Sequence, residues 1–321
     1  MQYFANLALA VFSASDNGVL AYEAGGARSI SQLVWLDRSG KQLEALGPPG
    51  DYLEPRISGD GRRVAMDIRD LRTGKADIWI YDLTRRVSTR FTSEPPDNVF
   101  PVWSPDGSRV VFASNRKGSD DLYQKVSSGT GNDEEFLVQE RRLLVPTDWS
   151  SDGRFVVYNV SDVKTKRGWD LGIYSVADKK SSAFLSTPSS EANGRFSPDV
   201  RWLAYTSDDS GRNEVYVQPF PATGGKWQIS TAGGGQPVWN RNGKEIFYVS
   251  ADNKLMVVDV KADPGFEAGT PRALFDVRLK SGTGWKYDIS PDGQRFLANI
   301  AVEEVKANLI TLVLNWAAEI K

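Results

Sequence analysis

The sequence contains no cysteine and no histidine. Without cysteine, disulfides, thiolate nucleophiles and cysteine-ligated zinc are excluded. Without histidine, Ser-His-Asp triads, histidine general bases and histidine metal sites are excluded as well. Any chemistry would depend on carboxylates, Lys, Tyr, Ser or bound calcium, and the sequence predicts no cofactor and no metal site.

One-sided charge and long apolar runs are also missing. The 39 Lys and Arg residues nearly balance the 41 Asp and Glu residues, so nothing predicts binding to nucleic acid. No apolar run approaches the roughly 18 residues of a membrane-spanning helix, so no membrane insertion is predicted. An apolar stretch at residues 4–12 has no Lys or Arg before it. This favours a buried strand over a signal peptide.

What the chain has instead is an internal repeat. The letters S-P-D-G at residues 104–107 recur at residues 290–293, and looser copies begin at Ser13, Ser58, Ser150, Ser197 and Asn240. From Ser58 onward these anchors lie 46, 46, 47, 43 and 50 residues apart. Such a period indicates a repeat architecture. It predicts one domain over residues 1–321, with blades that start near residues 13, 58, 104, 150, 197, 240 and 290.

Each unit predicts four short antiparallel strands. A large apolar residue precedes each anchor, and Trp103, Trp149 and Trp239 are expected to be buried there between adjacent blades. The anchor itself suits a tight turn, which gives the repeated aspartates a structural role. Four antiparallel strands per unit are typical of a propeller blade. The predicted fold class is all-β, a seven-bladed β-propeller of four-stranded antiparallel blades, with six blades as the alternative.

The predicted binding site is a mouth of the central channel. Residues just before each innermost strand should converge there, and mixed charge with aromatics and Arg is typical of interaction surfaces. Tyr52, Phe100 and Trp285 are expected to be solvent-accessible at this mouth. The candidate binding residues are Asp51, Tyr52, Glu54, Asp97, Asn98, Phe100, Arg141, Arg142, Glu191, Asn193, Gln236, Trp285 and Lys286.

Ring closure is expected to be weak. The last unit places its third strand at about residues 309–316, which leaves only residues 317–321 for an outer strand. The missing strand would then come from residues 1–6. An incompletely covered edge should exchange its amide hydrogens quickly.

The repeats resemble a known family. The letters FPVWSPDG at residues 100–107, EVYVQPFP at 214–221 and GKWQIS at 225–230 are similar to TolB-type, WD40-like (PD40) propeller repeats. They are most similar to the C-terminal propeller of certain bacterial receptor-type serine/threonine protein kinases. The kinase motif H-R-D cannot exist without histidine. The resemblance therefore implies a sensory or interaction module in the periplasm, with the natural chain extending upstream.

Two functions follow from these observations. The first is a monomeric, non-catalytic module that binds a protein or a small-molecule ligand as part of a larger signalling protein. The alternative is a propeller enzyme, such as a polysaccharide lyase or lactonase, that uses Tyr, Arg and carboxylates or calcium. A tight cluster of those side chains inside the channel would favour the enzyme.

Overall fold

The computed structural model describes residues 12–15, 19–23, 30–93, 97–162, 168–263, 265–282, 284–302 and 310–314. Contacts divide the chain into two compact units, one of Met1–Ile30 with Val302–Lys321 and one of Ser31–Ala301. The described residues form strands and turns, and no helix among them is long and apolar enough to cross a membrane. The all-β prediction is confirmed.

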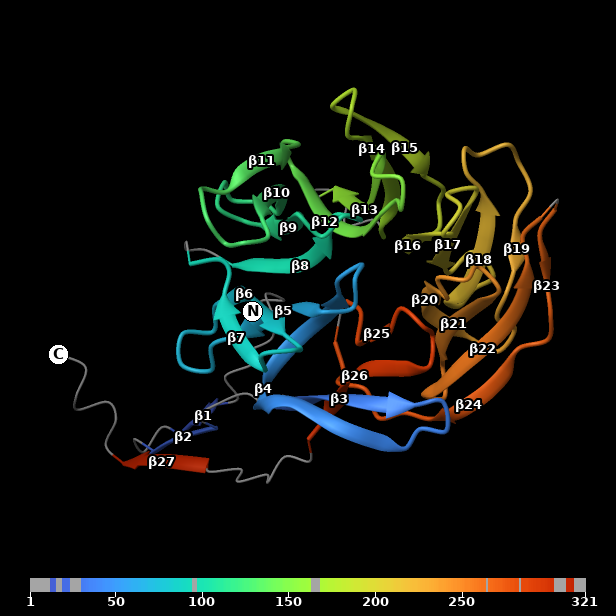
Figure 1. Cartoon of the computed structure of the whole chain (residues 1–321). Helices are drawn as coiled ribbons and strands as arrows, with labels where there is room; N and C mark the ends of the chain where they lie inside the picture. Colours follow the sequence, from blue (N-terminus) through green and yellow to red (C-terminus); the bar gives the residue numbers. More distant parts are fainter. Residues whose placement is uncertain are drawn as a thin grey trace. The chain divides into compact units, whose positions relative to one another are not determined.

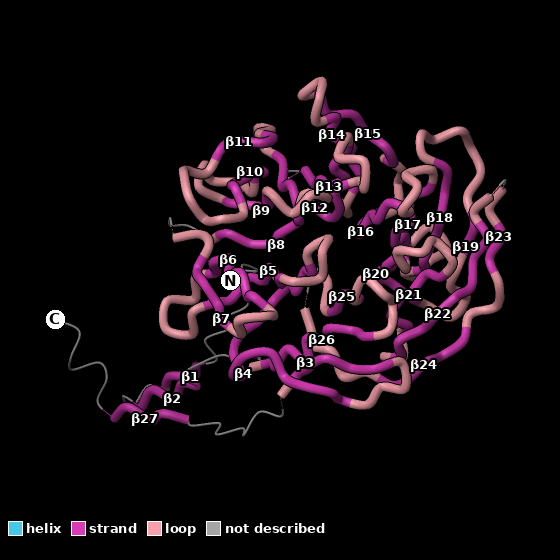
Figure 2. Tube along the Cα trace, in the orientation of Figure 1, coloured by secondary structure: helices cyan, strands magenta, loops and turns pink. Residues whose placement is uncertain are grey.

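The unit Ser31–Ala301 is a ring of four-stranded antiparallel groups, which we call blades 1 to 6 (Figures 1 and 2). Blade 1 contains residues 51–57 at the end of β4 (Gln42–Ile57), then β5 (Arg63–Arg69), β6 (Ala76–Asp82) and β7 (Val87–Arg90). Blade 2 contains β8 (Asn98–Trp103), β9 (Arg109–Ser114), β10 (Asp121–Val126) and β11 (Glu134–Leu137). Blade 3 contains β12 (Arg142–Trp149), β13 (Phe155–Asp162), β14 (Asp170–Ser175) and β15 (Lys180–Leu185).

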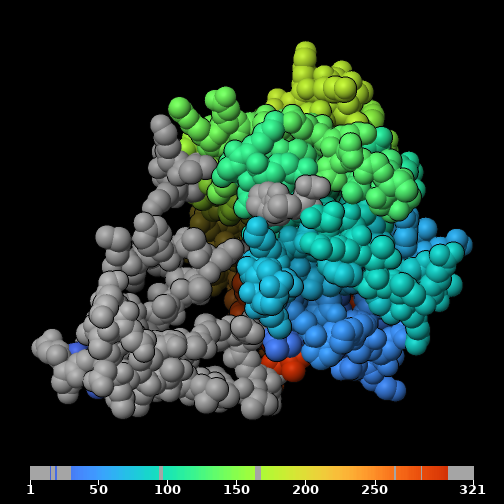
Figure 3. Space-filling model, turned by 90° about the vertical axis from the view of Figure 1, so that its left-hand side faces the viewer, coloured from blue at the N-terminus to red at the C-terminus, as the bar shows by residue number. Residues whose placement is uncertain are grey.

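The remaining blades complete the ring. Blade 4 contains β16 (Glu191–Phe196), β17 (Trp202–Ser207), β18 (Glu214–Pro219) and β19 (Trp227–Gln228). Blade 5 contains β20 (Gly234–Trp239), β21 (Glu245–Ser250), β22 (Lys254–Lys261) and β24 (Arg272–Asp276), with β23 (Glu267–Ala268) on the far end of β22. Blade 6 contains β25 (Tyr287–Ile289), β26 (Arg295–Ala301), β3 (Ser31–Asp37) and the first part of β4. Seen from the side, blades that follow one another in sequence lie side by side (Figure 3).

Apolar side chains fill the spaces between blades. Phe247 of blade 5 contacts Phe296 of blade 6 with ring centroids 5.1 Å apart. Trp285 and Tyr287 belong to the same buried cluster. Blade 6 in turn supplies Leu297 to the cluster that blade 1 shares. The ring is therefore closed by burial of apolar surface on both sides of blade 6.

Closure differs from the sequence-based prediction. Blade 6 takes its third and fourth strands from Ser31–Asp37 and the start of β4, because β26 pairs with β3 from Arg295↔Asp37 to Ala301↔Ser31. The expectation of an outer strand from residues 1–6 concerns residues outside those described. The expectation that residues 309–316 give the third strand of the last blade is wrong. Because β3 belongs to the ring and pairs with the free edge of β26, the backbone groups of that edge are hydrogen-bonded and closure is strong.

The seventh blade is not confirmed in the described chain, where the ring has six four-stranded groups. The copy that begins at Ser13 lies instead in β1 (Phe12–Ala14), which pairs with β2 (Val19–Glu23). In turn β2 pairs with β27 (Ile310–Leu314). These three strands belong to the smaller unit, while the ring spans Ser31–Ala301 rather than the whole of the predicted domain 1–321.

The anchor turns form as predicted. In blade 2, Gly107 donates its N–H to the Ser104 carbonyl at 2.8 Å and has φ of 68°, which suits glycine. The Ser104 hydroxyl donates to Asp106 Oδ1 at 2.6 Å. That hydrogen bond, with two more from Ser108, lowers the pKa of Asp106 to about 2. The repeated aspartates are thus turn residues held by their own serines.

Candidate functional site: the central pocket

One repeat position brings side chains from all six blades together. Two residues before each anchor, at the end of each innermost strand, the chain carries Arg56, Val102, Asp148, Arg195, Val238 and Asp288. All six line a pocket of about 410 Å³. Its other lining residues include Gly59, Pro105, Ser151 and Arg241, which are exposed in the anchor turns. The pocket therefore lies at the centre of the ring and opens on the face where the anchor turns lie.

The six side chains repeat in the order Arg, Val, Asp around the ring. Asp148 Oδ2 accepts the backbone N–H of Phe196 at 2.9 Å, and Asp288 Oδ2 accepts that of Ile57 at 2.8 Å. Each aspartate thus holds the innermost strand of the next blade, where an arginine of the ring lies one residue away. The pocket has an approximate two-fold repeat, in which blades 1, 2 and 3 correspond to blades 4, 5 and 6.

Tryptophans follow the same two-fold pattern on the pocket wall. Trp103 Nε1 donates to the Arg56 carbonyl at 2.9 Å, and Trp239 Nε1 donates to the Arg195 carbonyl at 3.2 Å. Both are buried between adjacent blades, as predicted. Trp149 differs because it is only half-buried and donates to Gly153 in its own turn at 3.1 Å. The prediction of burial between adjacent blades is met only in part, because Trp149 packs against Phe136 of blade 2, with ring centroids 5.5 Å apart, but stays half-buried.

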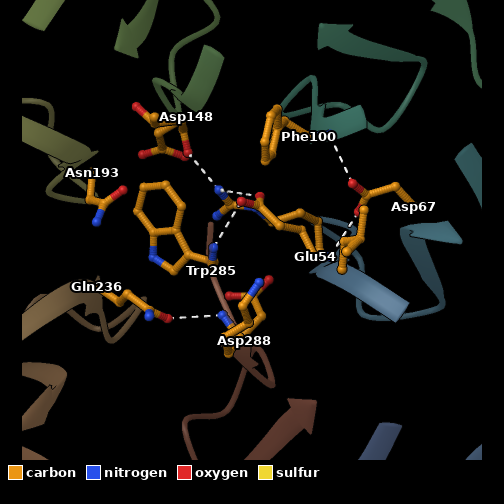
Figure 4. Close-up of polar contacts among 12 residues, drawn as sticks. Glu54, Asp67, Phe100, Asp148, Asn193, Gln236, Trp285 and Asp288 are labelled. Carbon is orange, nitrogen blue, oxygen red and sulfur yellow. Dashed lines mark hydrogen bonds and ion pairs between the residues drawn. The ribbon is translucent and has the colours of Figure 1, made fainter. Parts of the chain in front are cut away.

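The indole of Trp285 (Figure 4) lies against two arginines of the pocket lining. The guanidinium carbons of Arg56 and Arg195 lie 4.2 and 4.8 Å from the ring centroid of Trp285. A cation over an indole face is attracted by the ring quadrupole. Trp285 is 1% exposed, and its backbone N–H donates to Glu54 Oε1 at 2.8 Å. Trp285 is therefore a buried support for two arginines of the pocket, although it is not itself one of the residues that line the pocket.

The carboxyl groups around the axis have pKa values above the usual range of a carboxyl group. Burial raises the pKa of Asp148 to about 7, against the opposing effects of the Phe196 N–H and the Arg56 charge. Burial likewise raises the pKa of Asp288 and of Glu54. The nearby Arg195 Nη1 lies 3.4 Å from Asp148 Oδ1. The two aspartates of the lining face three arginines, Arg56, Arg195 and Arg241, so they offset the arginine charges only in part.

The predicted mouth lies at the other end of the innermost strands, and much of it is buried. Tyr52 is 4% exposed and Trp285 1%, so the expected accessibility of these two residues is wrong. Phe100 is half-buried. Glu54, Asn98, Glu191 and Lys286 are buried, Arg141 is exposed, and the rest are half-buried, namely Asp51, Asp97, Arg142, Asn193 and Gln236. Their role in binding stays a prediction.

Several of these residues have a structural role instead. Phe100, Asn193 and Gln236 sit at bulges with φ near 60°. Their backbone N–H groups donate to Asp67 Oδ2 at 3.3 Å, Asn159 Oδ1 at 2.9 Å and Thr206 Oγ1 at 3.3 Å. Each acceptor lies on the second strand of the preceding blade, nine residues after its anchor. A bulge re-aims the strand at the point where one blade joins the next.

The sequence-based prediction missed Arg56, Asp148, Arg195 and Asp288. The signal was present in the repeat alignment, because charged residues at the position two before the anchor interrupt the apolar pattern of an innermost strand. That position alternates with the large apolar residue next to the anchor, so it points to the opposite face of the strand.

Comparisons with known proteins agree with this architecture. Residues 36–167 match the family model described as TolB beta propeller domain. The chain is 18% identical to the structure of putative TolB from Agrobacterium tumefaciens, with a TM-score of 0.69 over 87% of this chain and 100% of that one. These findings support a β-propeller fold similar to that of TolB. At this identity the structural likeness shows the fold alone.

Curated relatives match part of the chain. The chain is 26% identical over 168 residues to the Tol-Pal system protein TolB of Helicobacter pylori, a match that covers 51% of this chain and 36% of that protein. It is 25% identical over 207 residues to the uncharacterized peptidase YuxL of Bacillus subtilis, which covers 51% of this chain and 31% of that protein. The match thus spans about a third of each relative.

Proposed function

We propose that this chain is a non-catalytic binding module whose ligand or protein partner enters the central pocket from the face of the anchor turns. The observation that carries the proposal is the pocket of about 410 Å³, to which all six blades contribute side chains. Its size lies within the range of roughly 300–1,000 Å³ that is usual for ligand sites. Apolar walls with a few convergent charged groups are also usual there.

One observation favours the enzyme alternative, and another speaks against it. Arg and carboxylate side chains do converge inside the channel. However, the oxygens of Asp148 and Asp288 accept hydrogen bonds from Arg195 or from backbone N–H groups. A carboxylate that is already engaged in this way is poorly placed to take a proton from a substrate. We therefore favour binding over catalysis.

The wider setting is part of the same proposal. We infer from the resemblance to the propellers of receptor-type kinases that the module serves as a sensory or interaction part of a larger signalling protein. The matches to TolB proteins support an extracytoplasmic location. A monomeric ring suits this role because its pocket needs no second copy to be complete.

The experiment probes arrays of immobilised short peptides and oligosaccharides with the purified, fluorescently labelled chain. Pro105→Trp places a large ring on the exposed rim of the pocket. Pro291→Trp is the matched control, because Pro291 holds the same place in its turn but does not line the pocket. We expect binding signals that Pro105→Trp removes and Pro291→Trp retains.

Other outcomes would redirect the proposal. Loss of the signals in Arg141→Glu alone would move the site to the opposite mouth. Release of cleaved sugars or peptides from the array would favour the enzyme. Equal signals in all variants, or none in the unaltered chain, would contradict the central pocket as the binding site.

A further inference from the structure

Hydrogen-bond partners are divided unequally between the acids and the bases of the pocket. Both oxygens of Asp148 and both of Asp288 have donors within 3.4 Å. On the arginines, by contrast, Nε and Nη1 of Arg56 and Nε and Nη2 of Arg195 have no hydrogen-bond partner among the described residues. The arginine Arg56 is 3% exposed. Beside Arg56, Glu54 Oε2 lies 3.6 Å from Nη2 and also has no hydrogen-bond donor among the described residues. The four unpartnered arginine nitrogens therefore outnumber this one unpartnered oxygen, and the region around the pocket has more spare donors than spare acceptors.

This imbalance indicates which charge a ligand of the pocket should carry. A buried guanidinium with unmade hydrogen bonds carries a free-energy cost that an acceptor in the ligand would remove. Stacking on Trp285 compensates the positive charge but supplies no acceptor to the N–H groups. A cationic ligand would have to compete for the aspartate oxygens with the hydrogen-bond donors that these oxygens already have. The geometry thus favours an anion.

We propose that the central pocket binds a ligand with a single carboxylate on an apolar body, and that Arg56 and Arg195 hold the carboxylate. This inference rests on the proposed function, since it takes the same pocket as the binding site. The planar guanidinium groups suit a carboxylate, which can accept two parallel N–H bonds.

The charge of the lining favours one negative charge over two. Three arginines, Arg56, Arg195 and Arg241, face two aspartates, which leaves one positive charge when all are ionised. A phosphate ester carries about −1.5 to −2 at neutral pH, which exceeds this single positive charge once both aspartates are ionised. In that state a monocarboxylate balances these five groups.

The walls indicate the rest of the ligand. Val102 with Trp103 and Val238 with Trp239 line the pocket from blades 2 and 5, which lie opposite each other in the six-bladed ring. Phe196 and Ile289 add further apolar surface. Two apolar walls across a charged base suit a flat or ring-shaped apolar body rather than a fully hydrated sugar.

The experiment measures binding of matched probes by isothermal titration calorimetry. Phenylacetate, phenylacetamide and phenyl phosphate differ mainly in the charge of the head group. We expect phenylacetate to bind with one site per chain and at least about tenfold more tightly than the amide, as a charge-assisted hydrogen bond implies. N-acetylphenylalanine mimics a peptide C-terminus. It should bind more tightly than phenylacetate if the natural carboxylate is the end of a peptide chain.

Variants test the role of the arginines. Arg195→Gln should weaken the binding of phenylacetate at least about tenfold and leave the binding of phenylacetamide unchanged. Arg85→Gln is the matched control, since the Arg85 side chain is 82% exposed. If Arg195→Gln fails to fold, Arg195→Lys replaces it. This variant keeps the positive charge but loses the planar guanidinium, so a smaller loss of phenylacetate affinity is expected. The three probes also test the proposal on the unaltered chain.

The outcomes separate this inference from the proposed function. Equal affinity for phenylacetate and phenylacetamide, or tighter binding of phenyl phosphate, would overturn the carboxylate. If Pro105→Trp still abolished array binding, the pocket would stand as the site for another ligand. Phenylacetate binding unchanged by both Pro105→Trp and Arg195→Gln would overturn the inference and count against the pocket.

Discussion

At the scale of single residues, two adjacent repeat positions serve two different purposes. The residue next to the anchor is apolar and packs between blades, while the residue before it points to the axis. Burial then decides how each axial group behaves. Asp148 keeps a side-chain exposure of 20% at the pocket, yet burial still raises its pKa to about 7. The axial acids are thus tuned by surroundings that several blades provide.

Replacing Asp148 by asparagine should change how stability depends on pH. The folded state raises the pKa of Asp148 from 3.8 to about 7, so it binds the proton more tightly than the unfolded state does. Its favourable contribution is complete below pH 3.8 and is lost as the pH rises to about 7. Asp148→Asn cannot ionise, so its unfolding free energy relative to the unaltered chain should increase from pH 5 to pH 8.

Urea unfolding at several pH values in this range measures the effect. Asp106→Asn is the control, because the pKa of Asp106 is lowered to about 2 and the group stays ionised throughout. Its stability difference should not vary between pH 5 and pH 8. A difference for Asp148→Asn that is equally constant would contradict the raised pKa.

The tryptophans of the pocket wall give a second prediction at this scale. Trp103 is 7% exposed, and its Nε1 bonds to the neighbouring blade. Trp103→Ala should lower the free energy of unfolding by about 3–5 kcal/mol, as for other buried large aromatics. Trp149 occupies the same repeat position but is half-buried, so Trp149→Ala should lower the free energy of unfolding by less. Chemical denaturation compares the two, and a loss under about 1 kcal/mol for Trp103→Ala would contradict its packing role.

At the scale of elements, the innermost strands are joined to the preceding blades through bulges. Asp67, Asn159 and Thr206 lie at equivalent places on second strands and accept N–H groups from bulge residues. Asn299 of β26 acts in the same region, where its Nδ2 donates to the carbonyls of Tyr52 at 2.8 Å and Leu53 at 3.1 Å. These contacts fix the rotation between neighbouring blades.

Removing one such acceptor should destabilise the ring. Thr206→Val keeps the shape of the side chain but leaves the Gln236 N–H without its acceptor, at a cost of about 1–3 kcal/mol for a buried donor. Thr270→Val on an exposed loop is the control and should stay within about 0.5 kcal/mol. Thermal or urea unfolding measures both. A cost for Thr206→Val no larger than that of the control would show that the bulge contact is dispensable.

At the scale of the whole ring, closure depends on β3 and β26. Seven register pairs join Arg295–Ala301 to Ser31–Asp37, and Leu33 is fully buried. In the ring, β3 lies between β26 and β4, as β6 lies between β5 and β7. The two ends of the ring are thus held by a blade that both of them build.

Hydrogen exchange under native conditions tests this closure. We expect the amides of Leu33 and Trp35 in β3 to exchange as slowly as that of Ile78 in β6, because both strands are covered on both edges. The exposed outer strand β7 supplies the fast-exchanging comparison. Exchange of β3 at the rate of β7 would restore the weakly closed ring that the sequence suggests.

The sequence by itself determined the all-β class, the four-stranded blade and the anchor turns. These features depend on neighbours within about ten residues, such as Ser104 with Asp106 and Gly107. It also placed Trp103 and Trp239 correctly between blades. Local spacing is enough for such features because turns and hairpins form from contiguous residues.

Only the tertiary structure decided the number of blades in the ring, its closure and the face that carries the pocket. Pairing of β26 with β3 joins residues that are far apart in sequence, so no local pattern distinguishes it from pairing with residues 309–316. Trp285 is buried because Arg56 and Arg195, from two other blades, meet over its ring. A predicted loop position therefore became a buried support for the pocket arginines, since burial is set by contacts that the ring creates only when it closes.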